Sequence, residues 1–190
     1  MRTILVVGGS RGIGREIVKN LLPDNNVISF SRNKSELEHE NLVNYEVDVV
    51  KDELPEINEL DSVVYCPGSI NLKPFSRLKT SDYLEDFEIN VLGAVRVLKE
   101  YEKVLKKGDN PSVVLFSTVA SDMGMVFHAS VAVSKSGVEG LVKSLAAEWA
   151  PTIRVNAIAP TITDTSLAKR ILRNDDIREK MKDRHPLKRI

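Results

Sequence analysis

Glycines are concentrated in one early segment, GGSRGIG, which occupies residues 8–14 and follows a short apolar run. Glycines at positions 8, 12 and 14 let a backbone turn tightly and approach a ligand closely. The next residues, 14–22, have helical spacing, and a helix N-terminus offers free N–H groups and the positive end of a dipole. This arrangement predicts a loop that binds a pyrophosphate; a tight turn without a ligand is the alternative. The residues assigned to the loop are Gly8, Ser10, Arg11, Gly12, Ile13 and Gly14.

The second apolar segment ends in SFSRN, residues 29–33, and carries no carboxylate. In dinucleotide sites, a carboxylate at this place accepts a hydrogen bond from the ribose 2′-hydroxyl of NAD. Ser31, Arg32 and Arg11 are available instead, and arginine suits a 2′-phosphate. The segment therefore predicts NADP rather than NAD, and two solvated surface arginines are the alternative. Asp48, after the third apolar segment, could accept from an adenine amino group or could form a turn.

Apolar runs that predict strands alternate with amphipathic stretches that predict helices. The predicted strands span residues 3–8, 26–31, 41–48, 61–66, 111–118 and 152–159. The predicted helices span residues 14–22, 80–107, 128–150 and about 166–183, with a weak helical turn at 35–40. We predict Ser81 as the N-cap of the long helix and Gly108 as its stop. The link between the third and fourth strands is too short for a full helix and is broken by Pro55.

This order of elements predicts parallel pairing with right-handed crossovers. Strands that are apolar throughout are typical of a sheet with helices on both faces. We therefore predict a doubly wound three-layer α/β sandwich of the Rossmann-like kind, with six strands in a mostly parallel sheet. In such a sheet, ligands bind at the carboxyl ends of the strands.

Composition limits the function classes that the chain can serve. Its 190 residues, 42% of them hydrophobic, suit a single domain over residues 1–190. Lys+Arg and Asp+Glu are both 27, so no overall positive charge favours nucleic acid or a membrane surface. A single cysteine, Cys66, indicates a reducing compartment, and the short N-terminal apolar run is neither a signal sequence nor a membrane span. We expect a cytoplasmic protein without a metal site.

Further features occur in a specific order along the chain: Asp48-Val49, the turn that ends at Gly68, Asn90 within the long helix, Thr118, Lys135, and RVNAIAP followed by Thr165. Together with the glycine loop, this set resembles the compact, single-domain short-chain dehydrogenase/reductases. The likeness runs from Arg2 to about Thr165. It implies a nicotinamide dinucleotide and a small-molecule substrate, and a homo-oligomer, either a dimer or a tetramer. Outside the glycine loop, it implies cofactor contacts from Ser31, Arg32, Asp48, Val49, Gly68, Asn90, Lys135, Pro160 and Thr165.

The resemblance also implies a catalytic set of Asn, Ser, Tyr and Lys. Asn90 falls on the asparagine that holds a proton-relay water through its backbone, and Lys135 falls on the lysine of the YxxxK motif. Thr118 falls on the serine, thirteen residues before the tyrosine position. Val131 falls on the tyrosine itself. The predicted catalytic residues are thus Asn90, Thr118 and Lys135, in an atypical active site.

Several other positions depart from the family pattern. Val7 replaces a threonine, Tyr65-Cys66-Pro67 replaces an asparagine-rich turn, and Thr161 replaces a glycine. Family members continue with another helix and a seventh strand, whereas this sequence stops at HPLKRI. We therefore expect a truncated C-terminus, which would affect both the substrate pocket and a common subunit interface.

Carbonyl reduction needs a hydride and a proton, and Val131 has no proton to give. His128 is one substitute, since an imidazole titrates near neutral pH, and an exposed loop histidine is the alternative. Tyr65 is another candidate donor, or an aromatic that only packs, and Cys66 is expected to be a small buried residue.

We predict an NADP-dependent oxidoreductase for a small or medium carbonyl or alcohol, with an altered proton donor. The alternative is a catalytically inactive NADP(H)-binding sensor or scaffold. A structural module without a cofactor accounts poorly for the glycine loop and Lys135.

Overall fold

In the computed structural model, six strands form one sheet in the order β3-β2-β1-β4-β5-β6, and every neighbouring pair is parallel. The structure describes residues 1–190 apart from the side chain of residue 170. The six strands are β1 (Arg2–Val7), β2 (Asn25–Ser31), β3 (Leu42–Glu46), β4 (Ser62–Tyr65), β5 (Ser112–Phe116) and β6 (Arg154–Ile158). The doubly wound, Rossmann-like prediction is confirmed, and the sheet is parallel throughout rather than mostly parallel.

The register brings the carboxyl ends of three strands to one place. Val7 at the end of β1 pairs with Phe30 of β2 on one side and with Tyr65 of β4 on the other. The strand order reverses here, because β2 and β3 lie on one side of β1 while β4, β5 and β6 lie on the other. A crevice at such a reversal is where doubly wound sheets bind ligands.

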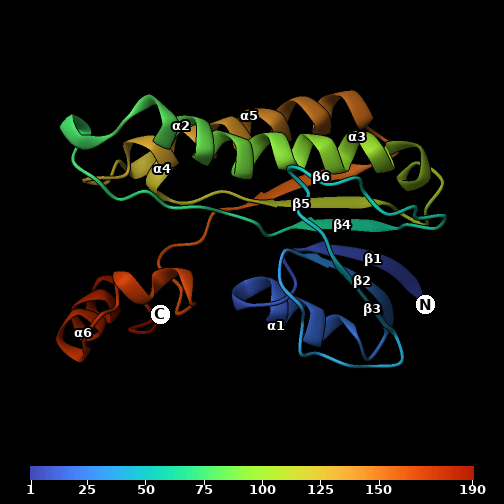
Figure 1. Cartoon of the computed structure of the whole chain (residues 1–190), viewed down its shortest axis with the longest axis horizontal. Coiled ribbons are helices and arrows are strands. Elements are labelled where there is room, and N and C mark those ends of the chain that lie inside the picture. The colour runs from blue at the N-terminus through green and yellow to red at the C-terminus, as the bar shows by residue number, and fades with distance from the viewer.

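Helices cover the two faces of the sheet unequally. Figure 1 shows α2 (Thr80–Phe87), α3 (Gly93–Leu105) and α5 (Ala129–Trp149) along one face, and α1 (Gly12–Leu21) on the other. Residues 47–61, which link β3 to β4, form no helix, as the short link predicts. Val43 and Tyr45 of β3 are consequently exposed.

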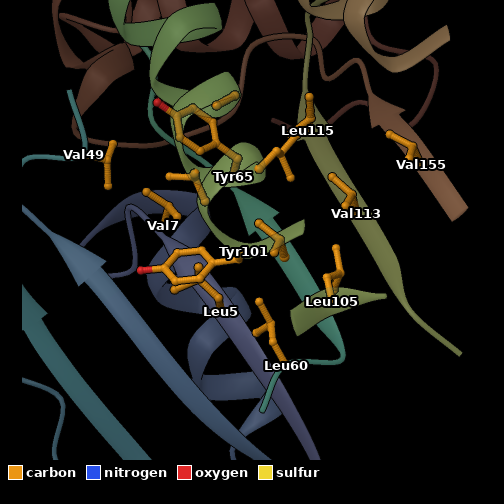
Figure 2. Close-up of a cluster of buried hydrophobic side chains, with 14 of the residues drawn as sticks. Leu5, Val7, Val49, Leu60, Tyr65, Tyr101, Leu105, Val113, Leu115 and Val155 are labelled. Carbon is orange, nitrogen blue, oxygen red and sulfur yellow. The ribbon is translucent and has the colours of Figure 1, made fainter. Parts of the chain in front are cut away.

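Two buried clusters follow from the alternation of side chains along β1. Leu5 and Val7 belong to the larger cluster, which also contains Tyr65 and Tyr101 (Figure 2). Ile4 and Val6 point the other way and pack with Val18, Leu22 and Val27. Because successive side chains of a strand face opposite sides, a strand covered on both faces must be apolar at every position.

The helix predicted over 80–107 begins at Thr80 and is not regular throughout. Lys79 is the residue before its first turn, and its backbone N–H donates to the Asp82 carboxylate at 2.8 Å. The prediction of Ser81 as N-cap is therefore wrong, because the acid three residues after Lys79 satisfies the free amide. A π-helical turn, Glu88–Leu92, separates α2 from α3. Helix α3 ends at Leu105, whose carbonyl accepts the N–H of Gly108 at 3.0 Å.

Three other segments differ from the sequence prediction. Residues 35–40 form no helical turn, and the Ser35 hydroxyl accepts the N–H of Leu37 at 3.2 Å instead, since short polar side chains compete for backbone groups. A short helix, α4 (Ala120–Met123), was not predicted. The predicted helix at 166–183 is two elements, a 3-10 turn (Leu167–Arg170) and α6 (Asp175–Arg184), where the Asn174 side chain accepts the N–H of Ile177 at 2.9 Å. None of the helices described has the length and apolar content needed to cross a bilayer.

Candidate functional site

A cavity of about 430 Å³ lies at the carboxyl ends of β1, β2 and β4. It is lined by residues of the glycine loop, the ends of β2 and β4, and the segments after β3 and β6. Most residues that the sequence assigned to a cofactor are brought together here: Gly8, Ser10, Arg11, Gly12, Ile13, Gly14, Ser31, Arg32, Asp48, Val49, Gly68 and Thr165. Pro160 and Thr118 do not line this cavity, and Asn90 and Lys135 lie beside it.

Two positions of the glycine loop favour glycine, Gly8 because of its backbone conformation and Gly14 because of a close backbone contact. Gly8 has φ +84° and donates its N–H to the Phe30 carbonyl at 2.7 Å, which fixes the loop to β2. A Cβ on Gly14 would overlap the Gly8 carbonyl oxygen and lie 2.9 Å from the Gly8 carbonyl carbon. The loop and the start of α1 are therefore in direct backbone contact.

The N-terminus of α1 is suited to an anion. Arg11 precedes the first turn, no described side chain caps it, and the first turn contains no acidic residue. The free amides and the helix dipole therefore face the cavity, and no acidic side chain of the first turn competes with a bound anion. This is the arrangement that a diphosphate needs.

At the end of β2, the chain offers cations and no carboxylate. Arg32 and Arg11 are exposed and both line the cavity. Ser31 is buried, and its hydroxyl donates to the Asn33 carbonyl at 2.8 Å, which orders the turn after the strand. Two guanidinium groups at this position can bind a phosphate monoester.

After β3, the segment that lines the cavity is held from two sides. The Asp48 carboxylate accepts the N–H of Val50 at 3.0 Å, so one of its oxygens stabilises a turn. Asp48 also lines the cavity. Arg96 of α3 donates to the carbonyls of Val49 at 2.6 Å and Asp52 at 2.9 Å. The sequence analysis missed Arg96, because nothing distinguishes it from other charged residues of a long helix.

Three of the predicted residues converge beside the cavity. A Cβ on Gly68 would lie 3.4 Å from Asn90 Oδ1 and 3.6 Å from Lys135 Nζ. The ammonium of Lys135 donates to the Phe116 carbonyl at 2.7 Å. Burial lowers the pKa of this lysine to about 8, because desolvation disfavours the charged form.

Asn90 lies within the π-helical turn and is buried. Its Nδ2 donates to the Asp86 carbonyl at 2.7 Å and to the Ser69 hydroxyl at 3.1 Å. Its Oδ1 is buried without a hydrogen-bond partner among the described atoms. The same irregular turn accepts a bond from outside the helix, since Tyr65 donates its hydroxyl to the Ile89 carbonyl at 2.7 Å.

The candidate proton donors differ in their surroundings. Val131 is only 4% exposed. Tyr65 belongs to the buried core, where desolvation raises the pKa of its hydroxyl well above the usual range, and its hydroxyl is bonded to the Ile89 carbonyl (Figure 2). His128 immediately precedes α5, is half-buried, and places Nδ1 2.8 Å from the Val126 carbonyl. Cys66 is half-buried, and burial raises the pKa of its thiol to about 12.

A cluster that the sequence analysis missed joins β5 to α5. Glu139, one turn after Lys135, accepts hydrogen bonds from Ser117 at 2.5 Å and Ser121 at 2.6 Å. These two hydroxyls lower the pKa of the Glu139 carboxyl. The cluster holds α5 against the end of β5, and thus fixes the place from which Lys135 extends.

Thr118 follows β5 and Pro160 follows β6. The two segments are joined by a hydrogen bond from Val119, the residue after Thr118. The Thr118 hydroxyl oxygen accepts the N–H of Ala120 at 3.3 Å, which leaves its proton for a ligand. The Pro160 carbonyl accepts the N–H of Val119 at 3.3 Å. Thr165 lies above the glycine loop, where a Cβ on Gly12 would be 3.5 Å from the Thr165 side chain.

The chain is similar in sequence to a known protein family and to several curated proteins. A family model described as enoyl-(acyl carrier protein) reductase matches residues 8–190. Tropinone reductase-like 3 of Erythroxylum coca is 35% identical over 130 residues, which cover 67% of this chain and 50% of that protein. The chain spans about half the length of the first curated relatives that it matches.

Solved structures share the fold over the whole chain. The ligand-free aldohexose dehydrogenase of Thermoplasma acidophilum superimposes with a TM-score of 0.89 at 24% identity, covering 100% of this chain and 81% of that one. The protein ElxO, solved with NADP bound, superimposes with a TM-score of 0.85 at 26% identity, covering 100% of this chain and 86% of that one.

Proposed function

Because the chain belongs to the short-chain dehydrogenase/reductase family, we propose that it is an NADP-dependent oxidoreductase acting on a small or medium carbonyl or alcohol. One observation carries this proposal: the open amides of α1, two arginines and the buried Lys135 all surround or adjoin the cavity of about 430 Å³. ElxO, at 26% identity, is similar in structure and was solved with NADP bound.

The residues divide the binding of the dinucleotide between them. The amides at the start of α1 would hold the diphosphate, and Arg11 and Arg32 would hold the 2′-phosphate. Asp48 and the segment fixed by Arg96 would border the adenine. The ammonium of Lys135 would hydrogen bond to the nicotinamide ribose, with its bond to the Phe116 carbonyl keeping it in place.

When bound, the nicotinamide supplies or accepts the hydride. The chain must then supply or remove the proton at the substrate oxygen, and Val131 cannot do so. We infer an altered proton donor, with Thr118 available to hydrogen bond the substrate oxygen.

The cofactor preference is tested by measuring the affinities for NADPH and NADH with wild type and Arg32→Asp. A carboxylate at position 32 repels a 2′-phosphate and can accept from a 2′-hydroxyl. We expect tighter binding of NADPH by wild type and at least a tenfold loss of that affinity, about 1.4 kcal/mol, in the variant. Equal affinities of wild type for both cofactors would remove the NADP preference.

A catalytically inactive NADP(H)-binding sensor or scaffold is the second candidate function, and the observation that favours it is the buried, aprotic side chain of Val131. Turnover of a panel of carbonyls should be compared for wild type, Val131→Tyr and Val133→Tyr. Val133 is 59% exposed on the same helix and serves as the matched control. Activity in wild type supports the oxidoreductase. An inert wild type with activity gained only at position 131 supports the sensor or scaffold.

A further inference from the structure

The segment that follows β6, residues 159–166, borders the cofactor cavity and forms neither helix nor strand. Thr165 and Ser166 line the cavity together with the glycine loop. A Cβ on Gly12 would lie 3.5 Å from both Cβ and Cγ2 of Thr165, so the methyl group of this threonine faces the loop. A dinucleotide that fills the cavity would therefore touch both the glycine loop and the 159–166 segment.

Helix α6 binds the 159–166 segment through two side-chain contacts. The Arg178 guanidinium donates to both oxygens of the Asp164 carboxylate, at 2.7 and 3.0 Å. Such a two-pronged pair fixes the orientation of the carboxylate as well as its distance. A second hydrogen bond joins the Thr161 hydroxyl to Nε2 of His185. The segment is thus attached to α6 at two points along its length.

The rest of α6 gives this attachment little support. No residue of the helix is fully buried, and Figure 1 shows α6 set apart from the sheet, at the lower left. Its half-buried residues include Ile177, Arg178, Met181 and His185, which recur at helical spacing and so share one face. Among the described atoms, no backbone hydrogen bond joins α6 to the 159–166 segment. Side-chain contacts therefore set the position of one relative to the other.

The other ion pairs of this region are local. Lys182 pairs with Glu179 at 2.6 Å, three residues earlier on the same helix. Lys188, just after the helix, lies 3.9 Å from the Asp183 carboxylate. Neither pair reaches the 159–166 segment. Among the described ion pairs, the one made by Arg178 is therefore the link from α6 to that segment.

We propose that Arg178 is a positioning residue for the cofactor, on which it acts through Asp164 and the adjacent Thr165. The inference rests on the proposed oxidoreductase function and gives a role to a helix whose described residues do not line the cavity. While the ion pair is formed, the 159–166 segment stays beside the glycine loop, and a bound dinucleotide leaves only when the segment moves. Loss of the pair should therefore speed cofactor release more than it slows association.

Stopped-flow measurement of NADPH release tests this role. Arg178→Met removes the guanidinium and keeps an apolar side chain, and Lys182→Met is the matched control in the neighbouring pair of the same helix. We expect NADPH to leave the Arg178 variant about fivefold faster than wild type, the upper limit for an ion pair whose side chains are 31% and 48% exposed. The control should release NADPH at the wild-type rate, and association should change by less than about twofold in both variants.

Two further measurements separate positioning from a general loss of stability. Asp164→Ala removes the other partner, so the double variant should release NADPH no faster than either single variant, because both changes break the same pair. The ratio of the Arg178→Met rate to the wild-type rate should also fall toward 1 at about 1 M salt, where the Debye length is about 3 Å. Effects that add in the double variant, or a ratio that does not change with salt, overturn the inference.

Failure of this inference can be told from failure of the proposed function. A wild type without affinity for NADPH refutes the proposed function, and the role of Arg178 with it. A wild type that binds NADPH, together with an Arg178 variant that releases it at the rate of the Lys182 control, refutes the inference alone.

Discussion

Replacing Gly14 with alanine should disrupt the cofactor loop, because the added methyl group meets backbone and not a flexible side chain. It would overlap the Gly8 carbonyl oxygen, lie 2.9 Å from the carbonyl carbon, and lie 3.3 Å from Cys66 Cβ. Gly8 cannot easily retreat, since its φ is +84° and its N–H is bonded to Phe30. The start of α1 must therefore move by about 1 Å relative to the loop to reach an ordinary contact distance.

Such a shift has consequences for both stability and binding. Overpacking costs about 1–3 kcal/mol, against which alanine gains about 1 kcal/mol in helix propensity. The net loss lowers Tm by a few degrees for a chain of this size, at about 2–4 °C per kcal/mol. Misplacing the α1 amides by about 1 Å should weaken their hydrogen bonds to the diphosphate, and loss of one such bond, about 1.5–3 kcal/mol, would weaken NADPH binding by about 10- to 100-fold.

Calorimetric titration with NADPH and thermal unfolding measure the two effects. The matched control is Gly140→Ala, at an exposed position in α5 where a Cβ would meet nothing within 4 Å. This variant should gain stability from helix propensity and keep its affinity. The reasoning fails if Gly14→Ala binds NADPH as tightly as the Gly140 variant.

Two further predictions concern buried hydrogen bonds. Tyr65→Phe removes the hydroxyl that serves the Ile89 carbonyl and should cost about 1–3 kcal/mol by chemical denaturation; an unchanged midpoint would show that the bond adds no stability. Glu139 has its pKa lowered by Ser117 and Ser121, so its contribution to stability is present above the unfolded pKa of about 4.3 and is lost as pH falls below it. Glu139→Gln should therefore flatten the fall of Tm between pH 6 and 3, and an equally steep fall would contradict this account.

The sequence determined the sheet and the glycine loop between β1 and α1. Apolar runs in regular alternation with helices specify a parallel doubly wound sheet, because each strand is covered on both faces and each crossover is right-handed. The spacing of Gly8 and Gly14 predicted a tight loop, and the structure explains why glycine is needed at both positions. Gly8 has a positive φ, and Gly14 makes a close contact with the Gly8 backbone. The family resemblance singled out Lys135 and Asn90, and the structure places both side chains near Gly68.

Only the tertiary structure decided what surrounds Lys135. Asp86 receives its hydrogen bonds from Ser69, 17 residues earlier, and Glu139 receives its bond from Ser117, 22 residues earlier. No periodicity or motif predicts such pairs, because they form where a loop after one strand meets the side of a distant helix. In the sequence, nothing distinguishes Asp86 from the other acidic residues of its helix. Only the folded structure shows that it is fully buried and that it bonds to the loop after β4 through Ser69 and Asn71. The charge balance of the site is thus a property of the folded chain, since desolvation acts only on groups that folding removes from water.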